Sequence, residues 1–169
     1  MYFSVRKTDG MEKRIWPRLR PGNNKDCDNI AKLVYGILRE YGLKPDPACT
    51  DADIKDIESS YFGRGGTFFV LEIEDGSIIG AYGLYPVDKQ TCELRKMYLH
   101  KAHRGKGLGK LLLEDALSKV RQLGFERIIL ETASVLKEAI ALYKNYGFIE
   151  YNPQHMSSRC DQAYLLELR

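Results

Sequence analysis

The sequence lacks the features that mark several classes of protein. Its 169 residues contain no apolar run close to the roughly 20 residues that cross a bilayer, and the start of the chain lacks the apolar stretch of a signal peptide. Its three histidines do not lie at metal-ligand spacing, and its four cysteines form no Cys-x-x-Cys pair. We therefore expect a cytoplasmic protein with reduced thiols, without a metal site and without a membrane segment.

The chain also has little excess charge of either sign. The formal net charge is only +3 and is spread along the chain, whereas a nucleic-acid-binding protein usually carries a clustered basic face. The densest basic cluster, from Lys101 to Lys110, is interrupted by glycines. This arrangement favours a small anionic ligand and predicts no nucleic-acid partner.

The length is enough for one compact domain and short for two. No internal repeat, low-complexity run or interdomain linker divides the chain. Because Met11 begins a more domain-like segment, we expect residues 1–10 to be a loose extension and residues 11–169 to form a single domain.

Hydrophobic spacing predicts four helices and seven strands. The helices are expected from Asp26 or Asp28 to 41, over 54–61 after a helix-start box at 50–53, over 108–123, and after a cap at Ser134 as far as 146. The strands are expected over 15–20, 68–74, 78–85, 91–99, 127–131, 148–151 and 163–168. The third helix should bury a stripe made of Leu108, Leu111, Leu112, Ala116, Val120 and Leu123.

The order of these elements predicts one α/β domain with a mixed sheet. Residues 75–76 are Asp-Gly, a strong hairpin signal, and a turn at 86–90 adds a third strand to this antiparallel meander. The strand at 91–99, the helix at 108–123 and the strand at 127–131 form a βαβ unit. Those two strands should therefore be parallel.

A glycine-rich loop lies between the strand and the helix of that unit, over 103–110. Exposed N–H groups at a helix N-terminus form an anion site, and glycines let the main chain approach a phosphate closely. Arg104, Lys106 and Lys110 add positive charge. The loop therefore predicts a ligand that carries a phosphate or diphosphate.

Two other glycine loops are excluded by residue identity. In a P-loop, Ser or Thr follows the lysine, whereas here Leu111 follows Lys110. In a dinucleotide-binding loop, Gly-x-Gly-x-x-Gly follows the first strand, whereas that spacing from Gly107 ends on Leu112.

The remaining motif is Arg104-x-x-Gly107-x-Gly109, followed by Ala139-Ile-Ala-Leu-Tyr143-Lys-Asn-Tyr-Gly147-Phe148. With these two runs in this order, the chain resembles the GNAT superfamily of N-acetyltransferases from about Arg14 to its end. The resemblance implies a mixed, mostly antiparallel sheet of six to seven strands, with a βαβ cofactor unit and a splayed central strand pair. It also implies acetyl-CoA as the cofactor.

The strand at 91–99 adds support for this resemblance. Its apolar residues Leu94, Met97 and Leu99 do not alternate strictly, and the slip of one residue indicates a β-bulge. In the family such a bulge opens a gap for the pantetheine arm, and the N–H of Met97 would polarise the thioester carbonyl. The cofactor-binding residues implied by the resemblance are Met97, Tyr98, Leu99, Arg104, Gly105, Lys106, Gly107, Leu108, Gly109 and Lys110, with Ser134 as a substitute where relatives carry asparagine near Leu136.

The resemblance also implies two catalytic residues. Glu93 is the candidate base, acting through water, and the alternatives are an exposed strand glutamate and a salt-bridge partner for Arg95. Tyr143 is the candidate acid for the departing thiolate, and the alternative is a core tyrosine.

The acceptor is less determined by the sequence. A small-molecule primary amine is preferred, because the loop at 44–50 is not notably acidic, as a groove for basic peptides often is. The alternatives are a protein lysine or N-terminal acetyltransferase and a non-catalytic acyl-CoA-binding module. The resemblance also suggests a homodimer. Candidate acceptor contacts are Tyr35, Tyr61, Tyr85, Arg95, His155 and Arg159.

Overall fold

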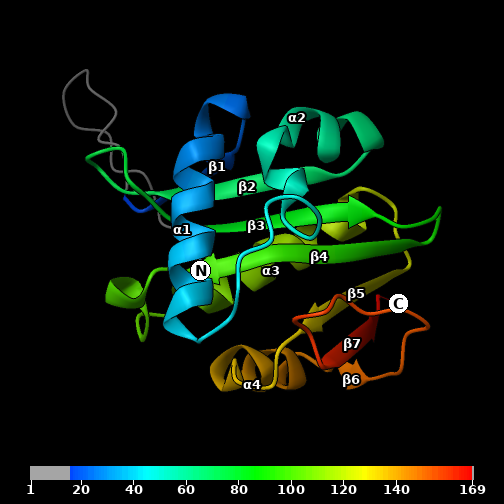
Figure 1. The fold of residues 1–169 in the computed structure, drawn as a ribbon. Helices are drawn as coiled ribbons and strands as arrows, with labels where there is room; N and C mark the ends of the chain where they lie inside the picture. Colours follow the sequence, from blue (N-terminus) through cyan, green and yellow to red (C-terminus); the bar gives the residue numbers. More distant parts are fainter. Residues whose placement is uncertain (1–15, 169) are drawn as a thin grey trace.

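A seven-stranded mixed sheet forms the centre of this computed structural model, in which residues 16–168 are described (Figure 1). The strand order is β1-β2-β3-β4-β5-β7-β6, and β4 and β5 are its parallel neighbours. The other neighbours are antiparallel, which confirms the predicted mixed, mostly antiparallel sheet. The strands are β1 (Arg18–Pro21), β2 (Thr67–Glu72), β3 (Ile78–Pro86), β4 (Thr91–Leu99), β5 (Arg127–Thr132), β6 (Ile149–Glu150) and β7 (Gln162–Glu167).

Helices cover both faces of this sheet. Helix α1 (Cys27–Glu40) lies in front of it in Figure 1, α2 (Ile57–Ser60) lies at its upper edge above β2, and α3 (Leu108–Gln122) lies behind. Helix α4 (Lys137–Asn145) lies beside β5 and β7, below the point where β4 and β5 diverge. Among residues 16–168, no helix is long and apolar enough to span a membrane.

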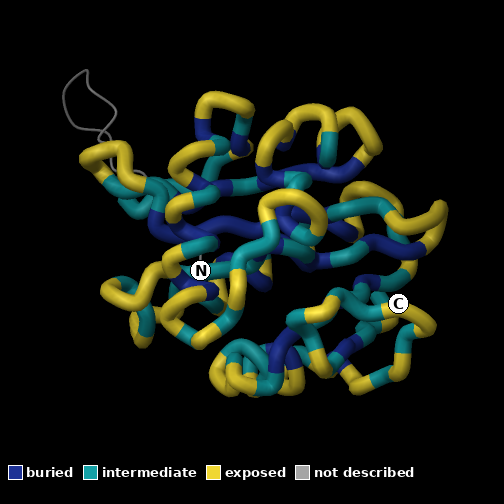
Figure 2. Tube along the Cα trace, viewed as in Figure 1, coloured by how far each residue is buried: buried dark blue, intermediate teal, exposed yellow. Residues whose placement is uncertain are grey.

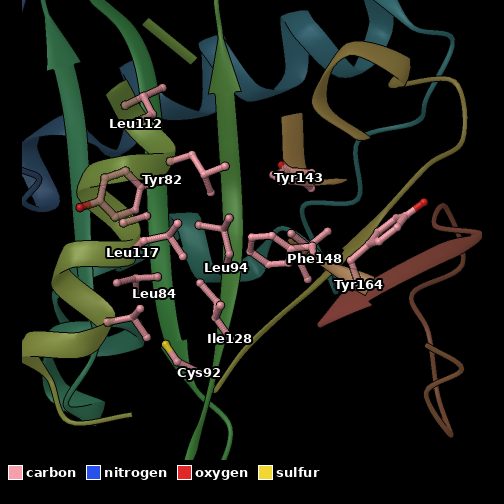
Figure 3. Packing of buried hydrophobic residues seen from close by; sticks show 14 of the residues in the cluster. Tyr82, Leu84, Cys92, Leu94, Leu112, Leu117, Ile128, Tyr143, Phe148 and Tyr164 are labelled. Carbon is pink, nitrogen blue, oxygen red and sulfur yellow. The ribbon is translucent and has the colours of Figure 1, made fainter. Parts of the chain in front are cut away.

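Two apolar clusters fill the space on the two sides of the sheet, because successive strand side chains point to opposite faces. Val70 packs against α1 and α2, whereas the next residue, Leu71, belongs to the cluster under α3. Figure 2 shows β3 buried along most of its length between these layers. Figure 3 shows part of the second cluster, in which Leu94 and Ile128 of the central strands lie near Tyr143 and Phe148.

The buried face of α3 differs in part from the predicted stripe. Leu112, Ala116 and Val120 are buried as expected, but Leu111 and Leu123 are 40% and 41% exposed. Leu113 and Leu117 take their place in the core. Positions 112, 113, 116, 117 and 120 form one contiguous helix face. This face packs against the core, and Leu111 and Leu123 lie outside it.

The predicted bulge and the splayed strand pair are both present in β4. Between β3 and β4, Gly83 pairs with Arg95 and Ala81 pairs with Tyr98, so β4 has one residue more than its partner. Lys96, at this bulge, has a left-handed φ of 53°. Strand β4 pairs with β5 only over Thr91–Glu93, although both strands continue. The βαβ unit is therefore confirmed, and its parallel strands separate after Glu93.

The sequence-based prediction is wrong for the region between α1 and β2. The expected helix over 54–61 is divided into a 3-10 turn, Ala52–Lys55, and the single turn of α2, because Asp56 adopts an extended conformation. The expected helix-start box does not cap it either. Asp46 accepts hydrogen bonds from the N–H groups of Cys49 and Thr50, and the Asp51 side chain turns inward.

Two element ends also differ from the prediction. Helix α4 begins at Lys137, and Ser134 does not cap it, because both its N–H and its hydroxyl donate to Asp161. Strand β6 has two residues instead of four. Residue 15 of the first predicted strand and the expected extension at 1–10 lie outside the described residues.

Candidate active site

A cavity of about 820 Å³ lies where β4 and β5 diverge. Its walls come from residues 93–99 of β4, 130–132 of β5, the inner side of α4 and the start of α3. Two loops complete it, at 46–50 and at 155–160. The divergence of two parallel strands therefore creates the space, and loops distant in the sequence close its outer side.

The glycine loop at one end of this cavity is suited to a diphosphate. Gly105 and Gly107 have left-handed φ angles of 74° and 78°, and Gly107 is the N-cap of α3. The N–H groups of the first helical turn therefore have no intrahelical acceptor, and they carry the positive end of the helix dipole. A Cβ at Gly109 would meet only Leu142 Cδ2, at 3.8 Å, so the main chain there is open to a close approach.

The structure brings some, but not all, of the predicted cofactor residues to the cavity wall. Met97, Tyr98, Leu99, Arg104, Gly105 and Gly109 line it. Lys106, Gly107, Leu108 and Lys110 belong to the same loop and helix start but do not line it. Ser134 does not line it either, and its side chain is bonded to Asp161 at 2.6 Å.

The Arg104 side chain binds protein groups within the chain. Its Nε donates to the Leu99 carbonyl at 3.0 Å, and its guanidinium binds both Glu40 carboxylate oxygens at 2.6 and 3.1 Å. The same group bonds the Tyr41 hydroxyl. Arg104 therefore joins the end of α1 to the end of β4, and a carboxylate already neutralises its charge.

The main chain of β4 is unpaired at the centre of the cavity. In the sheet formed by the described residues, Lys96 and Met97 have no register partner on β3, and β4 has no partner on β5 beyond Glu93. An unpaired peptide group needs another hydrogen-bonding partner. This segment is therefore available to a ligand in the gap between the strands.

Tyr143 fits both readings of its role. It is only 5% exposed and lies against the Phe148 ring, as a core residue would, yet it also lines the cavity. Burial raises the pKa of its phenol well above the usual value, and among residues 16–168 no hydrogen bond joins its hydroxyl. The phenol is thus neutral and retains its proton.

Glu93 fits the base and the salt-bridge partner, but it is not an exposed strand residue, because its side chain is 15% exposed. It lines the cavity, and it accepts a hydrogen bond from Arg95 Nε at 2.6 Å. Burial raises the pKa of Glu93, although Arg95 opposes the shift. The Arg95 guanidinium in turn lies 3.7 Å from the centre of the Tyr85 ring, which fixes the direction of the pair.

A buried ionic network is the part of the site that sequence reasoning missed. Asp51 is fully buried. Its carboxylate accepts hydrogen bonds from both terminal nitrogens of Arg159, at 2.6 and 2.7 Å, and from Lys96 Nζ, at 2.7 Å. Burial raises the pKa of Asp51, but these donors more than offset it and hold it well below its usual range. The positive φ of Lys96 has no signature in the sequence, and Asp51 resembled part of a helix start.

The candidate acceptor contacts divide into two groups. Arg95, His155 and Arg159 line the cavity, whereas Tyr35, Tyr61 and Tyr85 do not. Tyr61 is fully buried, and its hydroxyl donates to Asp53. Within residues 16–168, no group of His, Cys, Asp and Glu is placed to hold a metal ion.

A model of the acetyltransferase (GNAT) family matches residues 31–148. The chain belongs to the acetyltransferase (GNAT) family. This membership confirms the family and the enzyme class that the loop and helix motifs indicated, an acetyl-CoA-dependent N-acetyltransferase.

Named relatives agree with this GNAT membership. The chain is 39% identical over 137 residues to YjgM, an uncharacterized N-acetyltransferase of Escherichia coli, covering 78% of this chain and 81% of that protein. It is 35% identical over 106 residues to human N-acetyltransferase 8, covering 59% of this chain and 45% of the human one.

Solved GNAT structures share the fold. An acetyltransferase from Staphylococcus aureus superposes with a TM-score of 0.84 at 24% identity, covering 90% of this chain and 99% of that one. The putative acetyltransferase yncA of Salmonella typhimurium, solved with acetyl-CoA, has a TM-score of 0.69 at 21% identity, covering 90% and 94%. The predicted single GNAT fold is thereby confirmed.

Proposed function

We propose that this protein transfers the acetyl group of acetyl-CoA to the primary amine of a small molecule, by direct attack while both substrates are bound. The observation that carries the proposal is the cavity between β4 and β5, because a glycine-capped helix start, unpaired strand main chain, a carboxylate and a neutral phenol all meet there. Each of these groups answers one requirement of acetyl transfer.

The binding groups are main-chain amides. Those of residues 105–110 hold the diphosphate, and the open surface at Gly109 lets it approach. The main chain of Met97, Tyr98 and Leu99, which has no partner on β5, pairs with the pantetheine arm in the gap between the strands. Acetyl-CoA supplies an activated acyl group as a thioester, and the N–H of Met97 stabilises negative charge that develops on its carbonyl oxygen.

Two side chains manage the protons. An amine must be neutral to attack, and Glu93 accepts the proton through water, with its pKa raised by burial toward the working range of a base. Tyr143 donates a proton to the departing thiolate, because burial keeps its phenol protonated. Arg95 holds the Glu93 carboxylate in place.

A small acceptor is supported by the loops that close the cavity. A peptide that presents an internal lysine needs an open groove, but Arg159 of the loop at 155–160 pairs with Asp51, which directly follows the loop at 46–50. A contact between the two loops that line the cavity favours a small acceptor over a peptide. The cytoplasmic location and the homodimer expected from the sequence stay predictions.

The test is a panel of small amines and peptides, followed by thiol release from acetyl-CoA. We expect turnover with small primary amines and little with peptides. Turnover confined to peptides would contradict the acceptor class, and tight binding of acetyl-CoA without any turnover would favour the non-catalytic module.

A further inference from the structure

A lysine with a left-handed backbone lies at the centre of the proposed site. Only Lys96 among the described non-glycine residues has a positive φ, at 53°. Such a conformation is unfavourable for a residue with a long side chain, and it persists where surrounding contacts enforce it. Lys96 is also the bulge residue of β4, and it directly precedes Met97.

The side chain of Lys96 makes buried and mainly ionic contacts. Lys96 Nζ donates to the Thr50 carbonyl at 2.9 Å and to Asp51 at 2.7 Å, and it lies 3.4 Å from Asp53. The Lys96 side chain is 4% exposed, and those of the two carboxylates are 0% and 9% exposed. Water therefore screens these interactions little.

The network balances its charges and joins three parts of the chain. Lys96 and Arg159 oppose Asp51 and Asp53, two cations against two anions. They come from the bulge, from the loop at 155–160 and from the segment between α1 and α2. A buried ion pair is weak evidence for stability, and its better supported use is to select one geometry.

We propose that Lys96 is a positioning residue for acetyl transfer, whose buried ionic contacts hold the β4 bulge so that the Met97 N–H faces the gap between β4 and β5. The effect of Lys96 on the rate rests on the proposed function. Its role in holding the bulge can be tested without that function. The Lys96 side chain extends to Asp51 and Asp53, and its backbone is left-handed. The next residue, Met97, has no register partner on β3.

Substitution of Lys96 should affect kcat more than the affinity for acetyl-CoA. The glycine loop and the pantetheine gap bind most of the cofactor, whereas the Met97 N–H acts on charge that develops during transfer. Lys96→Leu should therefore lower kcat by about tenfold or more, as expected when an oriented donor is misplaced, and change the acetyl-CoA dissociation constant by less than about threefold. Lys96→Arg should recover a large part of the rate.

Removing the Lys96 charge unbalances the buried network, and this effect requires its own control. Lys96→Leu leaves the buried network with one excess negative charge, which alone is destabilising. The double variant Lys96→Leu with Asp53→Asn is neutral again. We expect it to fold at least as well as Lys96→Leu and to stay slow. Lys89→Met, on the exposed turn between β3 and β4, is the matched surface control and should keep the normal rate.

A spectroscopic readout tests the structural part without activity. The chain has only four methionines, so protein labelled with ¹⁵N-methionine gives few amide signals, and Met97 can be assigned by substitution. In the ligand-free protein, the Met97 signal should move in Lys96→Leu and in the neutral double variant, and return toward its original position in Lys96→Arg.

The outcomes are distinct from failure of the proposed function. If the unmodified protein neither binds acetyl-CoA nor turns it over, the proposed function fails while the Met97 signal still tests the bulge. A Met97 signal unchanged in Lys96→Leu would overturn the positioning role, and so would a normal rate in the neutral double variant. Equal losses of kcat and of acetyl-CoA affinity would also contradict it.

Discussion

At the scale of single residues, Tyr143 and Glu93 perform two tasks each. Both contribute to packing or to an ion pair, and both line the cavity between β4 and β5. The two readings that the sequence leaves open are therefore compatible. Kinetics of single substitutions can tell which task has the larger consequence.

Tyr143→Phe removes the phenol hydroxyl and keeps the ring against Phe148. Since the hydroxyl has no hydrogen-bond partner among residues 16–168, folding should be unaffected. Acetyl transfer should slow by about a hundredfold, the usual contribution of a general acid. Calorimetry should give near-normal acetyl-CoA affinity. An unchanged kcat would show that Tyr143 is only a core residue.

The pH dependence of the rate tests Glu93. Burial raises its pKa above the usual 4.5, and a base must be ionised, so kcat should fall as the pH falls through this raised pKa. Glu93→Gln should be slow and should lose that acidic limb. A slow Glu93→Gln enzyme that keeps the same limb would assign the titration to another group.

At the scale of elements, the start of α3 is the proposed diphosphate site. Arg104 already binds Glu40 and the Leu99 carbonyl, so the proposal relies on main-chain N–H groups and the helix dipole. The substitutions that test it are therefore at glycines.

Gly109→Val is the cleanest of these substitutions. Gly109 has an ordinary φ, and a Cβ there meets only Leu142 at 3.8 Å, so the fold should tolerate the change. The added methyl groups would occupy the approach to the main chain, and CoA binding measured by calorimetry should be abolished. Gly107→Val should also abolish it, but with added backbone strain at a φ of 78°.

Gly36→Val is the matched control on α1. Gly36 is also helical, nothing lies within 4 Å of its Cβ position, and it does not line the cavity. Its CoA affinity should be normal. Unchanged CoA affinity in Gly109→Val would contradict the proposed diphosphate site.

The bulge, the glycine loop and most of the buried stripe of α3 were predictable because each depends on residues close together in the sequence. The slip from Leu94 to Met97 indicated the bulge, and the order of strand and helix indicated the parallel pair. The network of Asp51, Lys96 and Arg159 was not predictable, since its partners lie 45 and 108 residues apart. The partner of Ser134, 27 residues away, was hidden for the same reason.

At the scale of the whole molecule, the contact between Asp51 and Arg159 connects the N-terminal and C-terminal halves of the chain across the cavity. Arg159→Gln leaves a fully buried carboxylate with one cation fewer. Chemical denaturation should show a loss of about 3 kcal/mol in the free energy of unfolding, as when one partner of a buried pair is removed. Arg127→Gln, which breaks a partly exposed pair with Glu167, should cost less than about 1 kcal/mol.

The same contact predicts a pH dependence of stability. The pKa of Asp51 is lowered in the folded protein, so its stabilisation is present above the unfolded value near 4 and is lost as the pH falls below it. Asp51→Asn should show a smaller loss of stability between about pH 4 and pH 2 than the unmodified protein. An equal loss in both would mean that other carboxylates dominate acid unfolding.

The central claim is that main-chain amides of residues 105–110 bind the diphosphate of acetyl-CoA. A crystal structure of the protein with CoA measures this directly. The account predicts the diphosphate oxygens within hydrogen-bond distance of those amides, and the pantetheine arm in the gap beside Met97. A diphosphate bound elsewhere, or crystals that take up no CoA, would contradict it.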